Sequence, residues 1–201
     1  FNSSRFVDFP PRMLFLDQIE WLADSGISTG WVEPEGTLTY HPWQPITRDA
    51  MAAFFYRLAG SPVFDAPATS PFTDVTPATP FYKEMTWMHA QGIATGYADG
   101  TFRPWDPVNR DAMAAFMYRV ASSPAYTSPA ASLFADIELT DQFYKEISWV
   151  YQVGVANNAD DGTFDPDVPV TREMMAVFMY RLVNPPALTI QITALPGASV
   201  G

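Results

Sequence analysis

The chain has 201 residues, of which 48% are hydrophobic and 16% charged, against roughly 25% charged in an average soluble domain. This composition excludes a wholly disordered chain, and no apolar run approaches the roughly 20 residues of a membrane-spanning helix. The net charge of −11 argues against nucleic-acid binding, and the absence of cysteine excludes disulfides and thiolate chemistry. We therefore expect a folded chain with no nucleic-acid partner and no membrane insertion.

One sequence unit occurs three times along the chain. Residues 81–119 and 143–181 are identical at more than half of their aligned positions, and the first part of the chain keeps the same frame. Recurrence at a fixed period is the sequence signature of a repeat architecture. The clearest recurring positions are Asp8, Asp74 and Asp136; Trp21, Trp87 and Trp149; Gly26, Gly92 and Gly154; and Arg48, Arg110 and Arg172.

The first helix of each copy is predicted from apolar residues at helical spacing. Phe15, Ile19 and Leu22 fall on one helical face, and the same pattern recurs in the second copy. The recurring glycine after this helix, Gly26 in the first copy, is typical of a C′ stop. The recurring tryptophan of this helix favours packing in the core over stacking on a sugar.

The loop between the two helices carries candidate ligand contacts. Residues 99–102 and 161–164 read Asp-Gly-Thr-Phe, which predicts tight turns, and residues 35–38 of the first copy are a looser version. Backbone geometry alone also explains a glycine in such a turn. Tryptophans that follow the loop prolines are candidates for groove walls. The candidate sugar contacts in these loops are Gly100, Thr101, Gly162, Thr163, Trp43 and Trp105.

The second helix of each copy is predicted to begin after an N-cap at Thr47, Asn109 or Thr171. An arginine, the recurring Arg48, Arg110 or Arg172, then takes the first helical position. Backbone N–H groups and the helix dipole favour an anion there, and a planar guanidinium suits a carboxylate. The alternative interpretation is a structural ion pair with the recurring aspartate. The methionines of this helix are expected to fill the core.

The expected fold is mainly α, with three helix-loop-helix repeats that pack on one another, because a lone helical hairpin cannot bury both faces. We divide the chain into repeats at 1–60, 72–121 and 133–184, with linkers at 61–71 and 122–132. Both linkers are rich in Pro, Ser and Ala. Residues 185–201 are a tail or the start of a further domain, and 188–193 alternate as one strand would.

No metal, cofactor or catalytic residue is predicted. The acidic loop at 157–167 invites a calcium interpretation but fails the EF-hand frame, because Ala159 and Val168 fall at ligand positions. His41 and His89 occupy unmatched positions, which argues against a zinc site. Candidate acids recur across the copies, as framework residues do, whereas the carboxylate pair of a glycosidase would usually be unique.

The repeated frame resembles the S-layer homology family. The resemblance is clearest at residues 92–102, Gly-Ile-Ala-Thr-Gly-Tyr-Ala-Asp-Gly-Thr-Phe, with 108–112, Val-Asn-Arg-Asp-Ala. It covers about residues 6–183 in three copies. The family's usual start of the second helix is Thr-Arg-Ala-Glu, and here the acid sits one residue earlier. The resemblance implies a pseudo-threefold bundle at the surface or wall of a bacterial cell.

The same resemblance implies a non-catalytic anchor for an exported protein. Such modules bind secondary cell-wall polysaccharide, commonly bearing pyruvate ketals, in the grooves between copies. Arg48, Arg110 and Arg172 are the residues that we expect to meet a pyruvate ketal or a uronic acid. The alternative is a module for self-assembly or for docking another surface-layer protein.

Overall fold

Each of the three sequence copies folds into a pair of helices, within the described residues 4–157 and 161–185 of this computed structural model. A short antiparallel pair, β1 (Trp31–Val32) and β2 (Leu38–Thr39), lies in the first copy. The fold is mainly α, as predicted, and the strand predicted at 188–193 lies outside the described residues. In chain order the helices are α1 (Leu16–Asp24), α2 (Arg48–Leu58), α3 (Tyr82–Ala90), α4 (Arg110–Val120), α5 (Tyr144–Gln152) and α6 (Arg172–Val183).

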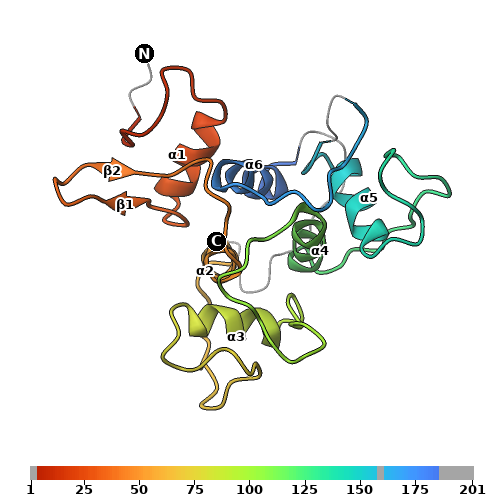
Figure 1. Ribbon diagram of the computed structural model, residues 1–201, viewed down its shortest axis with the longest axis horizontal. Helices are drawn as coiled ribbons and strands as arrows, with labels where there is room; N and C mark the ends of the chain where they lie inside the picture. The colour runs from red at the N-terminus through yellow and green to blue at the C-terminus, as the bar shows by residue number, and fades with distance from the viewer. Residues whose placement is uncertain (1–3, 158–160, 186–201) are drawn as a thin grey trace.

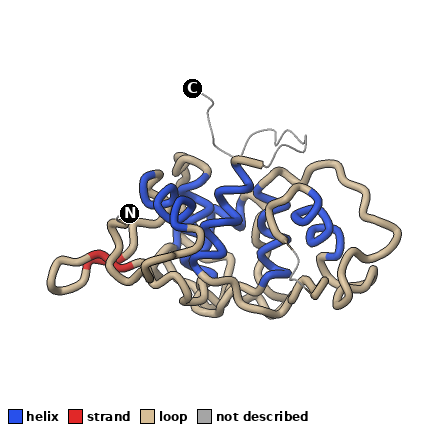
Figure 2. The backbone as a smooth tube through the Cα atoms, turned by 90° about the horizontal axis from the view of Figure 1, so that it is seen from above, coloured by secondary structure: helices blue, strands red, loops and turns tan. Residues whose placement is uncertain are grey.

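The second helices meet at the centre of the molecule and the first helices surround them. Figure 1 shows α2, α4 and α6 close to a common axis, with α1, α3 and α5 on three arms. The main helix contacts join different copies, since α3 packs on α2, α5 on α4 and α1 on α6. The first and last copies therefore close a ring. Seen edge-on in Figure 2, the molecule is elongated and shallow, and the β1–β2 hairpin projects at one end.

Backbone hydrogen bonds link the three copies around this axis. The residue two positions before each second helix donates its N–H to its counterpart in another copy. The distances are 2.8 Å from Ile46 to the carbonyl of Val170, 3.0 Å from Val108 to Ile46, and 2.8 Å from Val170 to Val108. These bonds form a closed triangle of buried residues. Because no copy can complete the triangle alone, the three copies depend on one another.

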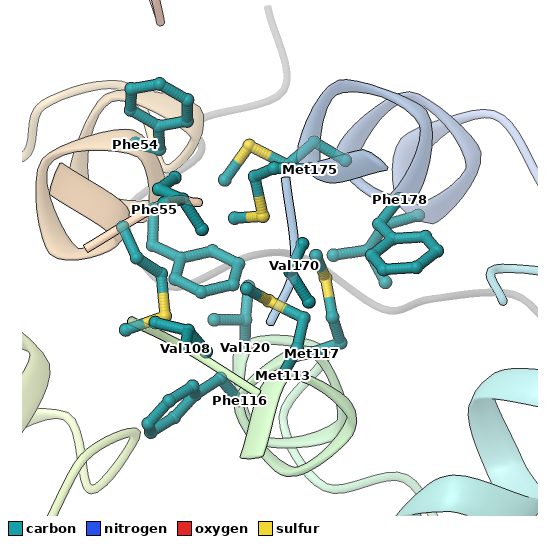
Figure 3. Packing of buried hydrophobic residues seen from close by; sticks show 14 of the residues in the cluster. Phe54, Phe55, Val108, Met113, Phe116, Met117, Val120, Val170, Met175 and Phe178 are labelled. Atoms are coloured by element: carbon teal, nitrogen blue, oxygen red, sulfur yellow. The ribbon is translucent and has the colours of Figure 1, made fainter. Parts of the chain in front are cut away.

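The hydrophobic core lies where the three central helices converge. Figure 3 shows Phe55, Met113, Met117 and Met175 pointing toward one another beside Val170. All five are buried. The methionines of the second helices are therefore core residues, as predicted. Their flexible thioether chains fill the irregular space between three helices of different sequence.

Aromatic pairs fix each outer helix to the central helix of the preceding copy. Trp87 of α3 and Trp149 of α5 are 2% and 1% exposed, which confirms their predicted core position. Trp87 stands edge-on to Tyr56 of α2, with ring centroids 5.3 Å apart. Trp149 meets Tyr118 in the same way at 5.3 Å, and the half-buried Trp21 meets Tyr180 at 5.4 Å. The recurring tryptophan thus carries the contact between copies.

The first helices begin one residue later than their apolar pattern predicts. Phe15, the N-cap of α1, has φ 61° in the left-handed region and is 40% exposed, so it does not belong to the buried face. Ile19 and Leu22 are buried as expected. Phe81 and Phe143 take the same conformation before α3 and α5. At the other end of α3, the expected C′ glycine Gly92 has φ 69°.

Two glycines of the second copy provide a matched test of this loop. Gly96 has φ +78°, and a Cβ there would lie 2.8 Å from a ring carbon of Phe72 and from the backbone oxygen of Thr101. Gly92 has φ +69°, but a Cβ there would have no atom within 4 Å. We expect Gly92→Ala to lower the free energy of unfolding by about 1 kcal/mol, the cost of a left-handed L-residue. Gly96→Ala adds steric overlap and should cost at least twice as much in urea denaturation. Equal losses for the two variants would contradict this account of the packing.

Candidate functional site

The recurring aspartates hold the inter-helix loops closed. In the second copy, Asp74 accepts the N–H groups of Phe102 at 2.8 Å and of Arg103 at 2.7 Å. Asp136 does the same in the third copy, and Asp8 accepts the N–H of Tyr40 at 2.9 Å in the first. Within residues 4–157 and 161–185, no ion pair joins these aspartates to the helix-start arginines. The alternative interpretation of those arginines, a structural ion pair, is therefore wrong.

The helix-start arginines instead cross from one copy to the next. They are only 6%, 9% and 6% exposed in chain order, and each Nε donates to a loop carbonyl of the next copy around the ring. The three bonds are Arg48 to Phe102 at 2.7 Å, Arg110 to Phe164 at 2.7 Å and Arg172 to Tyr40 at 2.9 Å.

Aromatic rings surround these buried charges. The guanidinium carbon of Arg48 lies 4.7 Å from the ring centroid of Phe102, 4.9 Å from Tyr97 and 5.6 Å from Phe116. Cations in this position are attracted by the electron-rich ring faces. Burial lowers the pKa of the Arg48 guanidinium, but arginine starts so high that the side chain keeps its charge in a folded protein. Each contact between copies thus contains a desolvated positive charge.

The backbone amides at the helix starts are already occupied. The N–H of Arg48 donates to the carbonyl of Asp106 at 3.1 Å, and that of Asp49 donates to Pro104 at 2.9 Å. The next N–H, of Ala50, donates to the Asp49 carboxylate at 2.7 Å. The sequence predicted that these amides favour an anion, whereas in the structure the first two bind the loop of another copy and the third binds the Asp49 carboxylate. At this position, the guanidinium is therefore the group that remains available to bind an anion.

A pocket of about 330 Å³ opens beside Arg48. Its wall combines a cation from the first copy, polar and aromatic side chains from the second, and the start of α5 from the third. Charged, hydrogen-bonding and aromatic groups that converge in one cavity are typical of a small-ligand site. The residues that carry this chemistry are Arg48, Tyr97, Asn109, Asp111, Arg119 and Phe143.

Two charged residues of the pocket wall, Arg119 and Asp111, determine which ligand groups the pocket can bind. Arg119 donates Nη1 to the carbonyl of Ile93 at 3.1 Å and lies 5.7 Å from the ring of Phe143, so it is held at the pocket wall. Burial raises the pKa of Asp111. The pocket therefore offers guanidinium groups for a carboxylate and a carboxyl acceptor for hydroxyl groups. A sugar that carries an acid group has both.

The predicted contacts in the Asp-Gly-Thr turns lie outside this pocket. Gly100 donates its N–H to Tyr97 at 2.9 Å, and its carbonyl accepts from Thr73 at 2.9 Å. The Thr101 hydroxyl donates to Asp99 at 2.6 Å and holds the pKa of that carboxyl at about 2.

The equivalent turn of the third copy repeats this pattern. The Thr163 hydroxyl donates to Asp161 at 2.6 Å, and the Gly162 carbonyl accepts from Ala135 at 3.1 Å. Gly100, Thr101, Gly162 and Thr163 therefore use these polar groups to build their own turns.

The loop tryptophans, candidates for groove walls, are exposed. Trp43 and Trp105 are 59% and 67% exposed. Trp43 lines a separate open hollow of about 480 Å³ with Asp8 and His41. Neither tryptophan lines the pocket beside Arg48. The structure therefore does not bring these two candidates together with that arginine.

A further residue beside these arginines is the aromatic residue that follows the second loop glycine, which was not predicted from the sequence. Tyr97 follows Gly96 in the second copy, and Trp31 follows Gly30 in the first. Tyr97 lies against Arg48, and Trp31 lies 4.3 Å from the guanidinium of Arg172. The signal was an aromatic residue directly after a recurring glycine. No sequence pattern connects this position to an arginine that is distant in sequence, because the contact forms only when the copies pack in a ring.

Comparison with known proteins supports the predicted resemblance. Residues 71–114 and 133–176 each match the family model of the S-layer homology domain. A cell surface protein of Thermoanaerobacter kivui is 28% identical over 120 residues, which are 58% of this chain and 16% of that protein. An endoglucanase of Bacillus sp. strain KSM-635 is 30% identical over 115 residues, 55% of this chain and 11% of that protein. The chain therefore spans less than a fifth of either relative.

The second and third copies thus carry S-layer homology domain sequence, and this chain is a protein of the bacterial cell surface or cell wall. Within the part of the chain that the structure describes, no helix has the length and apolar character to cross a bilayer.

Tyr40 provides a pH-dependent test of the contact between the first and third copies. Burial raises its pKa to about 12, and its hydroxyl donates to the Arg172 carbonyl at 3.3 Å. Because the folded state holds this proton more tightly, the stabilisation is complete below pH 10 and is lost as the pH rises toward 12. The free energy of unfolding should fall by about 1 kcal/mol from pH 10 to 11 because of this group. Tyr40→Phe should remove that part of the loss in urea titrations; superimposable pH profiles for the two proteins would contradict the assignment.

Proposed function

We propose that this chain is a non-catalytic module that anchors a bacterial protein by binding cell-wall polysaccharide in a groove between copies. We also propose that the first copy is a third, divergent S-layer homology domain. The bond from Arg172 to Tyr40 supports this, because it has the same geometry as those from Arg48 and Arg110 to their neighbouring loops. Asp8 likewise binds the backbone as Asp74 and Asp136 do.

The observation that carries the proposal is the buried Arg48 charge at the wall of an open pocket. Burying a cation is costly unless it is paired and hydrogen-bonded. Asp106 and Asp74 act on Arg48 without forming a direct ion pair among the described residues, and a carboxylate in the pocket, from a pyruvate ketal or a uronic acid, would provide that direct contact. Tyr97 forms part of the pocket wall, and Asp111 and Asn109 offer hydrogen bonds to the hydroxyls of the sugar.

The net charge of −11 does not prevent this contact. Long-range repulsion is screened beyond about 8–10 Å at physiological salt, whereas a short contact to a buried guanidinium is screened much less. The acidic surface slows the approach of an anionic polymer but does not weaken the contact once it forms. Binding is therefore expected to become faster as salt is added, up to the point where the contact itself is screened.

The recurring acids support a non-catalytic role. Asp74 and Asp136 each accept two backbone N–H groups, and Asp161 accepts from the Thr163 hydroxyl. Carboxylates that are fixed in this way stabilise loops and are poorly placed to act as an acid and base pair. The endoglucanase relative matches over only 11% of its length, so its printed activity does not transfer to this chain.

The exposed Trp43 and Trp105 favour a second candidate function. Large exposed aromatic side chains are enriched at protein interfaces. A module that self-assembles, or that docks another surface-layer protein, would use such residues, and the two functions are compatible in one anchor.

Binding to purified sacculi tests the anchoring proposal. We expect the chain to sediment with native sacculi and to stay in solution when the attached polysaccharide has been removed with hydrofluoric acid. Retained binding to stripped sacculi would assign the target to peptidoglycan. No binding to either preparation would contradict the proposal.

The double variant Trp43→Ala/Trp105→Ala separates the two candidate functions. If these residues serve self-assembly, the variant lowers the mass measured in sedimentation velocity at high concentration and still binds sacculi. If they form a wall of the ligand site, sacculus binding falls instead. A variant unchanged in both measurements would contradict a role for either tryptophan.

A further inference from the structure

The three grooves follow one plan but differ in the atoms that they leave open. We propose that the groove of Arg48 binds a carboxylate-bearing sugar in preference to the grooves of Arg110 and Arg172, because the chain itself provides acceptors for terminal nitrogens of those two arginines. This inference rests on the proposed polysaccharide binding and adds which groove is used and why. Hydrogen bonding, space and charge each support it.

Hydrogen bonding separates Arg48 from the other two arginines. Arg110 donates Nη2 to the carbonyl of Asn157 at 3.0 Å, and Arg172 donates Nη2 to the Ser28 hydroxyl at 2.9 Å. Among the described residues, the hydrogen bond of the Arg48 guanidinium comes from Nε alone. Its terminal nitrogens belong to a side chain that is only 6% exposed and lines the pocket. They are therefore the groups for which a ligand can provide acceptors.

One residue accounts for the contrast between the first and second copies. Ser28 follows Gly26 by two positions, and the same step from Gly92 leads to Ala94. Both side chains are buried. The Ser28 hydroxyl occupies a guanidinium N–H of Arg172, whereas the Ala94 methyl cannot accept a hydrogen bond. The third copy also has alanine here, Ala156, and there the Asn157 carbonyl takes the role instead.

The open space beside Arg48 also supports ligand binding there. The Arg48 pocket measures about 330 Å³ and is lined by polar and aromatic side chains, whereas the hollow on the core side of Arg110 measures about 10 Å³ and is lined mainly by apolar side chains such as Met113 and Phe178. The smaller hollow has room for about one water molecule. Arg172 is covered by Trp31, whose indole also packs on His41 with ring centroids 4.8 Å apart. The Arg48 pocket is thus large enough to hold a sugar ring.

Charge favours the same groove. Arg103 follows the loop phenylalanine of the second copy and lies over Tyr97 at 3.9 Å, so that two guanidinium groups lie near the Tyr97 ring. Arg103 also pairs with Asp99 at 2.9 Å. The equivalent residue of the third copy is Asp165; burial lowers the pKa of Arg110, and the Asp165 carboxylate partly offsets that effect. The loop of the second copy thus carries a cation at the position where the loop of the third copy carries an anion.

Calorimetry with a defined sugar tests the assignment. The probe is a methyl hexoside that carries a 4,6-linked pyruvate ketal, and the same hexoside without the ketal is the ligand control. We expect one bound probe per chain and no binding of the uncharged control. Ala94→Ser gives Arg48 the internal acceptor that Arg172 has, so affinity should fall by about tenfold or more, as loss of a charged hydrogen bond implies.

Ala156→Ser is the matched control, because it makes the same change at the equivalent position of the Arg110 groove. It should leave affinity and stoichiometry unchanged. Arg103→Gln is a second variant on an exposed side chain outside the core, and it should weaken binding by several-fold and reduce the salt dependence of the affinity. Urea denaturation of each variant checks that the fold is retained.

The outcomes distinguish this inference from the proposed function. Two or three bound probes per chain, or loss of binding in Ala156→Ser but not in Ala94→Ser, would overturn the single-groove assignment and leave polysaccharide binding intact. Binding to sacculi without binding of the ketal probe would show that a carboxylate is not the recognised group. Failure to bind both probe and sacculi would overturn the proposed function as well.

Discussion

The rest of the structure depends on a buried arginine at each contact between copies. Each guanidinium donates to a loop carbonyl of the next copy and lies among aromatic rings. A desolvated charge that is hydrogen-bonded in this way holds the loop, the helix start and the aromatic cluster in one geometry. The same charge supplies the chemistry of the site wherever its remaining N–H groups are not used internally. Structure and binding are thus two uses of one side chain.

The ring closure explains why three copies form one unit. Outer helices pack on the central helix of the preceding copy, and the triangle of hydrogen bonds at Ile46, Val108 and Val170 has no free end. Removing one copy would expose an apolar face on each neighbour. The first copy departs most from the repeated sequence, yet its Tyr40 and Asp8 keep the bonds of the other two. The closed ring of three copies therefore keeps these bonds, although the loop between the two helices of the first copy is longer than in the other copies.

Small differences between copies have large local consequences. An alanine in place of a serine, or a tyrosine in place of a tryptophan, leaves the backbone plan unchanged and alters what surrounds the arginine. Ala94 occupies the position equivalent to Ser28, whose hydroxyl accepts from Arg172, and Tyr97 lines an open pocket beside Arg48, whereas Trp31 lies over Arg172. Repetition stabilises the fold, and departures from it set one groove apart from the others.

The sequence by itself determined the local features of this protein. The repeated helix-loop-helix frame placed the six described helices, and glycine marked the ends of the first helices. Thr47, Asn109 and Thr171 stand at the N-cap positions predicted for the second helices. These features depend on neighbours along the chain. The tertiary structure alone decided which helices pair, that the helix-start amides are occupied, and that Asp74 binds backbone N–H groups rather than an arginine. It also decided that Tyr97 lies beside Arg48. These contacts join residues that are distant in sequence. Which residues meet depends on how the three copies close into a ring, and a local sequence pattern does not specify that closure.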